Sequence, residues 1–157
     1  MQRERNPAAT FGEFVDLWQK LLAEAGRPGT AVVVEGERDR RALRRLGWAG
    51  PIAIVHRGRT LSATAQALVE GSRRVILLTD WDSEGGLLAR RLRGFLEAER
   101  IDLDLDYRRR LARTLRGELV HVEGLYGWAR RNAERFGIPL ETVVATADPD
   151  EPARTTG

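Results

Sequence analysis

The stretch Val-Ile-Leu-Leu-Thr-Asp-Trp-Asp-Ser-Glu-Gly-Gly, residues 75–86, constrains the fold of this chain more than any other part of its sequence. Its apolar start predicts a buried strand, and the carboxylates of Asp80, Asp82 and Glu84 follow at once. A strand, an acidic turn and then a helix are typical of open α/β sheets, which bind ligands at the carboxyl ends of their strands. Such closely spaced carboxylates repel one another, and a hard cation such as Mg²⁺ would relieve this because it prefers oxygen ligands.

Strand-like and helix-like segments alternate along most of the chain. Apolar or alternating runs predict strands at 31–34, 51–55, 75–79, 101–107 and 118–122, and helical spacing predicts helices at 10–25, 37–46, 61–70, 87–99, 108–116 and 124–136. The first helix is expected to begin at Thr10, which has capping-box spacing to Glu13. This order predicts an α/β, Rossmann-like fold with a mostly parallel central sheet of four to five strands and helices on both faces.

Composition narrows the class of protein. The chain has 157 residues, a length typical of one domain, and we expect an N-terminal helical extension at 1–29, the main domain at 30–137, and a C-terminal extension with a disordered tail at 138–157. There is no cysteine, which excludes disulfides and thiolate zinc sites. No signal peptide or membrane span is evident, so we expect a cytoplasmic protein. Of the 26 basic residues, 25 are arginines. Arginine binds phosphate with paired hydrogen bonds, so this preference suits phosphate binding, but a nucleotide-composition bias in the gene explains it at least as well.

Acidic residues follow three of the predicted strands. Glu35 follows the first, Asp80 and Asp82 follow the third, and Glu123 follows the last. Because the carboxyl ends of parallel strands share one edge of a sheet, we expect these carboxylates to converge. Each also has a simpler reading: Glu35, Asp80 or Asp82 could cap the helix that follows it, and Glu123 could be solvated.

Other charged features favour structural readings. Asp102, Asp104 and Asp106 have the first spacings of a calcium loop but lack its glycine and its final glutamate, so we interpret them as the exposed face of a strand. The arginines at 108–110 are read as a solvated basic face, although they could touch a nucleic-acid backbone. The two histidines, at 56 and 121, are too isolated in the sequence to predict a zinc site.

Two of these segments resemble the motifs of the toprim domain. Val32-Val33-Val34-Glu35-Gly36, with Asp39 after it, resembles the first motif, and Thr79-Asp80-Trp81-Asp82-Ser83-Glu84-Gly85 resembles the aspartate motif. Toprim domains occur in type IA topoisomerases, bacterial-type primases and a ribosomal-RNA maturation nuclease. The resemblance covers roughly residues 30–125 and is greatest to small stand-alone archaeal members.

The resemblance implies a role for each matching residue. Glu35 would be the catalytic acid/base or a further metal ligand, and Asp80, Asp82 and Glu84 would bind Mg²⁺, with Mn²⁺ as a possible substitute. The candidate substrate or phosphate contacts are Gly36, Arg38, Asp39, Arg57, Gly58, Gly85 and Arg90, with Glu123 as an additional site residue.

The implied activity is Mg²⁺-dependent phosphodiester chemistry on nucleic acid. Hydrolysis, as in RNA processing or DNA repair, needs the least additional machinery, because topoisomerases and primases require further domains. However, Glu37 and Ser83 stand where relatives often carry cations. The alternative is therefore a non-catalytic module that binds nucleic acid or nucleotide and regulates a larger assembly. The sequence is compatible with RNA or DNA as the substrate, with either cleavage polarity, and with different numbers of metal ions and subunits.

Overall fold

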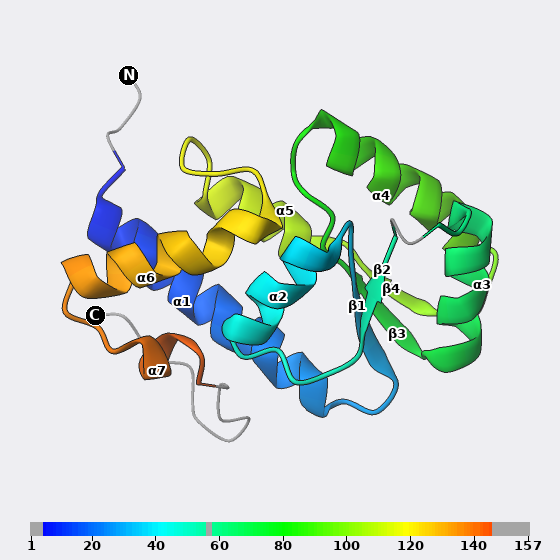
Figure 1. The fold of residues 1–157 in the computed structure, drawn as a ribbon, viewed down its shortest axis with the longest axis horizontal. Helices are drawn as coiled ribbons and strands as arrows, with labels where there is room; N and C mark the ends of the chain where they lie inside the picture. Colours follow the sequence, from blue (N-terminus) through cyan, green and yellow to red (C-terminus); the bar gives the residue numbers. More distant parts are fainter. Residues whose placement is uncertain (1–4, 56–57, 146–157) are drawn as a thin grey trace.

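A four-stranded parallel sheet lies at the centre of the molecule, with helices on both of its faces (Figure 1). The computed structural model describes residues 5–55 and 58–145. The elements in chain order are α1 (Pro7–Ala23), η1 (Glu24–Gly26), β1 (Thr30–Val34), α2 (Glu37–Arg45), β2 (Ile52–Ile54), α3 (Leu61–Gly71), β3 (Arg74–Leu77), α4 (Ser83–Leu96), β4 (Asp102–Asp104), α5 (Asp106–Thr114), η2 (Val122–Gly124), α6 (Leu125–Arg135) and α7 (Leu140–Val143). The predicted α/β, Rossmann-like class is confirmed.

The strand order reverses direction between β1 and β3, which is where open parallel sheets have a crevice. The sheet runs β2-β1-β3-β4, and all three neighbouring pairs are parallel. From β1 the chain continues to β2, which lies on one side of β1. It then crosses to β3 on the other side of β1, and β4 lies beyond β3. Sheets of this order bind ligands where the direction reverses, outside the carboxyl ends of the two middle strands. Glu35 follows β1 and Asp80 lies just beyond β3, so both belong to this crevice.

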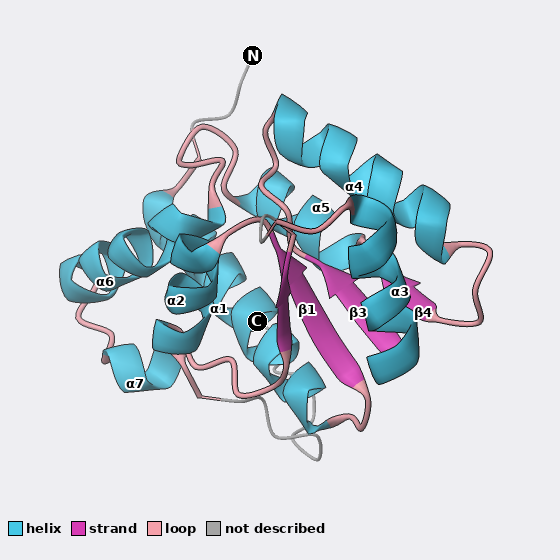
Figure 2. Ribbon diagram, turned by 45° about the vertical axis from the view of Figure 1, so that its right-hand side comes forward, coloured by secondary structure: helices cyan, strands magenta, loops and turns pink. Residues whose placement is uncertain are grey.

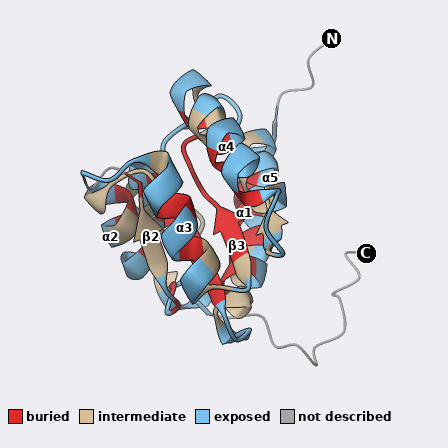
Figure 3. Cartoon of the chain, turned by 90° about the vertical axis from the view of Figure 1, so that its right-hand side faces the viewer, coloured by how far each residue is buried: buried red, intermediate tan, exposed pale blue. Residues whose placement is uncertain are grey.

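Alternate residues of the middle strands feed two separate cores. Val32 and Ile76 point into a large cluster with α1, α2, α5, α6 and α7, whereas Val33 and Leu77 point into a smaller cluster with α3 and α4. Figure 2 shows the same division, with α3 and α4 on one face of the sheet. Because both faces are covered, β1 is fully buried and so is most of β3, which is red in Figure 3. This burial explains the continuous apolar sequences of the two strands.

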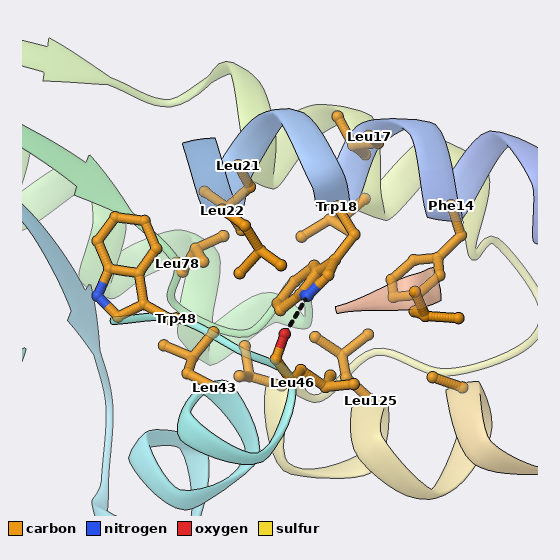
Figure 4. Packing of buried hydrophobic residues seen from close by; sticks show 14 of the residues in the cluster. Phe14, Leu17, Trp18, Leu21, Leu22, Leu43, Leu46, Trp48, Leu78 and Leu125 are labelled. Atoms are coloured by element: carbon orange, nitrogen blue, oxygen red, sulfur yellow. Dashed lines mark hydrogen bonds between the residues drawn. The ribbon is translucent and has the colours of Figure 1, made fainter. Parts of the chain in front are cut away.

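Helix α1 is an integral part of the larger core. Its Phe14 and Trp18 are fully buried, and their rings stack with centroids 5.5 Å apart. The indole Nε1 of Trp18 donates a 2.9 Å hydrogen bond to the backbone oxygen of Leu46, after α2 (Figure 4). This bond satisfies the one polar atom of the buried ring and ties α1 to the loop between α2 and β2.

Three local predictions are wrong. The segment 118–122 is not a strand, because its backbone is bound by Trp81: the Trp81 amide donates to the oxygen of Val120, and its indole donates to the oxygen of Leu119. Helix α1 begins at Pro7, with Asn6 as its cap, rather than at Thr10. The predicted strand at 101–107 is shortened to β4 because Asp104 accepts the amide of Asp106 and thereby starts α5.

No helix within the described ranges is long and apolar enough to cross a lipid bilayer.

Candidate metal centre

Carboxylates from two strand ends and one helix meet at the crevice between β1 and β3. Oxygen atoms of Glu35, Asp39 and Asp80 all lie within 4.8 Å of one another. Glu35 and Asp80 are 45 residues apart in the sequence, so the parallel sheet alone brings them together. Asp39 joins them from the first turn of α2.

A second group shares Asp80 with the first. Ligand atoms of Asp80, Asp82 and His121 also lie within 4.8 Å of one another. The imidazole Nδ1 of His121 is 3.1 Å from Oδ2 of Asp80 and 3.6 Å from Oδ2 of Asp82. Asp80 therefore stands between two possible ligand sets, and it is itself buried, with 8% of its surface exposed.

Backbone amides fix the orientation of three of these carboxylates. The amide of Val122 donates a 2.8 Å hydrogen bond to Oδ1 of Asp80. The amide of Gly85 donates to Oδ1 of Asp82 at 2.7 Å, and the amide of Gly36 donates to Oδ2 of Asp39 at 3.1 Å. Asp82 thus caps α4, as the simpler reading of the sequence allowed, and Asp39 forms part of the cap of α2. In each of these three carboxylates only one oxygen accepts the backbone amide named here.

The electrostatics of the cluster disfavour its full ionisation. Burial, a hydrogen bond with Asp80 and repulsion by neighbouring carboxylates raise the pKa of Glu35 from its usual 4.5 to about 8. Burial and the charge of Asp80 raise the pKa of Asp39 to about 6, although amide hydrogen bonds oppose this. Carboxyl groups that repel one another in this way hold protons unless a cation is present.

Arg108 lies beside the cluster, and its hydrogen bonds go to Thr79 and Asp80 in the turn after β3. Its Nε donates to the oxygen and hydroxyl of Thr79 at 3.1 Å, and its Nη2 donates to the backbone oxygen of Asp80 at 2.7 Å. Burial lowers the pKa of its guanidinium, while the nearby carboxylates oppose that shift. Arg108 therefore braces the turn after β3, and its hydrogen bonds go to Thr79 and to the backbone of Asp80, not to the carboxylate oxygens of the cluster.

The donor set fits a hard divalent cation. The carboxylate oxygens of Glu35, Asp39, Asp80 and Asp82 are ligands of the kind that Mg²⁺ and Mn²⁺ prefer. The imidazole of His121 is a poorer ligand for Mg²⁺, but it can orient Asp80 through their hydrogen bond.

The remaining predicted residues lie in various places. Glu84 is exposed in the first turn of α4 and, within the described ranges, belongs to neither ligand group. Arg90 is exposed on α4 and lines a small pocket with Arg108. Glu123 is exposed in η2, and its backbone and its charge both act on the pKa of Asp39, the backbone lowering it and the charge raising it.

Two of the three predicted glycines have local structural reasons. A Cβ atom on Gly85 would overlap the carbonyl oxygen of Asp80, so only glycine allows α4 to start this close to the turn. Gly58 has a left-handed φ of 70°, whereas a Cβ atom on Gly36 would meet open space. Arg57 lies outside the described residues, and Arg38 faces the groove that is treated below.

Two residues of the cluster, His121 and Arg108, are not predicted by the sequence, which favours an isolated strand histidine and a solvated basic face. Both contact Asp80 from segments that follow β4, over sequence separations of 41 and 28 residues. The only available signal was that His121 comes two residues before Glu123, which was already a candidate.

A separate cavity lies on the other side of β1, away from the cluster. It has a volume of about 750 Å³ and runs along β2 and α3, where it is lined mainly by apolar residues with Arg40, Arg59 and Thr64. The described residues that line it include no carboxylate, so it is separate from the cluster.

Comparison with known proteins finds related chains in archaea. The chain is 35% identical over 120 residues to a UPF0292 protein of Thermococcus gammatolerans, covering 76% of this chain and 86% of the relative. It is 36% identical over 121 residues to a UPF0292 protein of Thermococcus onnurineus, with coverage of 76% and 86%. A UPF0292 protein of Pyrococcus abyssi is 32% identical over 134 residues, which is 85% of this chain and 99% of the relative.

A solved structure supports the fold. A putative protein from Aquifex aeolicus aligns with a TM-score of 0.58 and 24% identity, covering 69% of this chain and 94% of that protein. No protein-family model matches the chain.

Proposed function

This chain belongs to the UPF0292 family, and we propose that it is a metal-dependent enzyme that hydrolyses phosphodiester bonds in nucleic acid. The observation that carries this proposal is the convergence of Glu35, Asp39 and Asp80 within 4.8 Å at the crevice of a parallel sheet. The resemblance of the segments around Glu35 and Asp80 to toprim motifs supports the reaction class. We further propose that the protein acts in the cytoplasm.

The residues divide into ligands and a proton carrier. Asp80 and Asp82 would hold Mg²⁺ or Mn²⁺, since each has one oxygen fixed by a backbone amide and their ligand atoms lie within 4.8 Å of each other. The chemistry that such an ion would supply is neutralisation of charge on the phosphate and acidification of water. Asp39 would add a ligand on the side of Asp80 that faces Glu35, because its oxygen lies within 4.8 Å of those two carboxylates.

Glu35 is suited to proton transfer. Its pKa of about 8 places it near neutrality, where a side chain can both accept and donate a proton. It lies at the open end of β1 and is only partly buried, so that a substrate phosphate could reach it. Within this proposal Glu35 takes a proton from the attacking water or gives one to the leaving oxygen.

The alternative is a binding module without catalysis, and one contact favours it. Glu37 forms ion pairs with Arg40 and Arg41, so the charge next to the first motif is already compensated within α2. A module of this kind would bind nucleic acid without a divalent cation and would tolerate loss of the Asp80 charge.

Cleavage assays with matched variants separate the two functions. Structured and single-stranded RNA and DNA are incubated with the protein in Mg²⁺, Mn²⁺ or EDTA. We expect cleavage only with a divalent cation, and its loss in Asp80→Asn and Glu35→Gln. Asp102→Asn is the control, because Asp102 is exposed and pairs with Arg74 at the opposite end of the sheet.

Calorimetric titration with Mn²⁺ completes the test. Binding that is lost in Asp80→Asn and retained in Asp102→Asn supports the metal centre. A protein that binds no Mn²⁺ and cleaves none of the substrates is not the proposed enzyme.

A further inference from the structure

A groove lined by arginines runs between α2 and α6, beside the carboxylate cluster. Its volume is about 580 Å³. The charged and aromatic residues that line it are Arg38, Arg41, Arg45, Glu123, Tyr126 and Arg130. Figures 1 and 2 show α2 and α6 as neighbours on the same face of the sheet.

The arginines of α2 form a row along the groove. Arg38, Arg41 and Arg45 are spaced by three and four residues, so they share one side of the helix. At a rise of ~1.5 Å per residue, the row extends over roughly 10 Å. Arg130 faces it from α6, which places positive charge on both walls of the groove.

Only one of these four arginines has an acidic partner among the residues that the structure describes. Arg41 pairs with Glu37 at 3.8 Å, whereas Arg38, Arg45 and Arg130 form no ion pair. Arg45 lies over the ring of Tyr126, with its guanidinium carbon 3.9 Å from the ring centroid, so its position is fixed without using its charge. Like charges gathered in one hollow favour an anionic ligand.

The groove lies beside the cluster. Glu123 lines it, and the backbone of Glu123 is near enough to Asp39 to oppose the rise in the pKa of that carboxyl. Arg38, the first residue of the row, is the direct neighbour of Asp39 in α2. An anionic chain that follows the row therefore arrives at the carboxylates.

We propose that the groove between α2 and α6 binds the sugar–phosphate backbone of a single nucleic-acid strand and leads it to the carboxylate cluster. A single strand is favoured because the arginines line two facing walls of one groove, with room for one backbone between them. The guanidinium groups suit phosphate oxygens, to which arginine binds with two parallel hydrogen bonds. The placement of the strand relative to the cluster rests on the function proposed above, whereas the binding itself does not.

Binding is measured by fluorescence anisotropy with a labelled single-stranded oligonucleotide, as DNA and as RNA, in EDTA at several salt concentrations. The test variant is Arg38→Ala/Arg130→Ala. The control is Arg73→Ala/Arg100→Ala, which removes the same charge from two exposed arginines that precede β3 and β4, at the opposite end of the sheet.

We expect the test variant to weaken binding about tenfold or more and the control to bind like the original protein. For single strands each neutralised phosphate contributes ~0.7 to the slope of log K against log salt, so losing two contacts should reduce the slope by ~1.4. Equal losses in both variants, an unchanged slope, or no binding by the original protein would overturn the proposal. The proposal would also be overturned if a polyglutamate of equal charge bound the protein as tightly as the oligonucleotide does.

The two proposals fail in different ways. If the oligonucleotide binds through Arg38 and Arg130 but no cation supports cleavage, the groove stands and the enzymatic proposal falls. If cleavage requires Asp80 but is indifferent to Arg38 and Arg130, the enzyme stands and the groove falls.

Discussion

The imidazole of His121 lies with its Nδ1 3.1 Å from Oδ2 of Asp80, although 41 residues separate the two in the sequence. This contact and the amide of Val122 hold both oxygens of Asp80 from one segment of chain, which follows α5. Asp80 is the residue common to both possible ligand groups. The loop that carries His121 and Val122 therefore controls the orientation of the central ligand.

We predict that His121→Ala weakens Mn²⁺ binding. Loss of a group that orients a metal ligand typically costs ~10–100-fold in affinity, and we expect a value in that range. His121→Asn should recover part of the loss, because its amide can still donate to Asp80. The measurement is calorimetric titration with Mn²⁺, and equal affinity in all three proteins would show that His121 has no such role.

The stability of the metal-free protein should fall as pH rises. Glu35 and Asp39 have pKa values raised to about 8 and about 6, so the folded state binds more protons than the unfolded state above pH 4.5. Stability is then fully present at low pH and is lost as pH rises toward 8. We expect the melting temperature in EDTA to decline across this window and the decline to be smaller in Glu35→Gln.

Added Mg²⁺ should reverse that decline at pH 8, because a cation compensates the ionised carboxylates and binds the folded state alone. A melting temperature in EDTA that does not change between pH 5 and 8 would mean that the carboxylates do not repel one another as described.

Gly85→Ala should destabilise the protein by roughly 1–3 kcal/mol, because the added methyl group overlaps the carbonyl oxygen of Asp80 and forces the turn to shift. Gly94→Ala, in the same helix, is the control. A Cβ there meets open space, and alanine in a helix interior is favoured over glycine by about 0.5–1 kcal/mol. Urea unfolding measures both, and destabilisation by Gly94→Ala as large as that by Gly85→Ala would refute the steric explanation.

Trp18→Ala should cost about 3–5 kcal/mol, the usual range for a large aromatic residue removed from a core. Trp18 is fully buried and bonded to Leu46, so α1 contributes to the stability of the sheet that it covers. Leu87→Ala, at a residue with 43% of its surface exposed, should change the free energy of unfolding by less than about 0.5 kcal/mol. Similar small losses at both positions would indicate that α1 is a detachable extension.

The sequence was sufficient wherever burial alone decides the structure. β1 and β3 were predicted because their faces are both covered, which requires continuous apolar residues such as Val32 and Val33. The parallel arrangement of β1 and β3 predicts that Glu35 and Asp80 converge, and in the structure their carboxylate oxygens lie within 4.8 Å of each other. The division of the chain at residues 29 and 137 stays a prediction.

Sequence reasoning failed where a distant partner decides the structure. Residues 118–122 include Leu119, Val120 and Val122, which favour a strand, but the amide and indole of Trp81 bind backbone oxygens that a strand would offer to its neighbour. His121 and Arg108 reach Asp80 only because this loop and α5 fold back over the turn. Local periodicity carries no information about such contacts.

The hydrogen bond from Val122 to Asp80 determines how long a polypeptide must be to hold the carboxylate cluster in the observed arrangement. A version truncated after α5 would retain all four strands together with Glu35, Asp39 and Asp82, yet Asp80 would lose both groups that restrain its carboxylate. The segment that holds the carboxylate cluster in place is consequently longer than the sheet, and a minimal engineered version has to extend past residue 122.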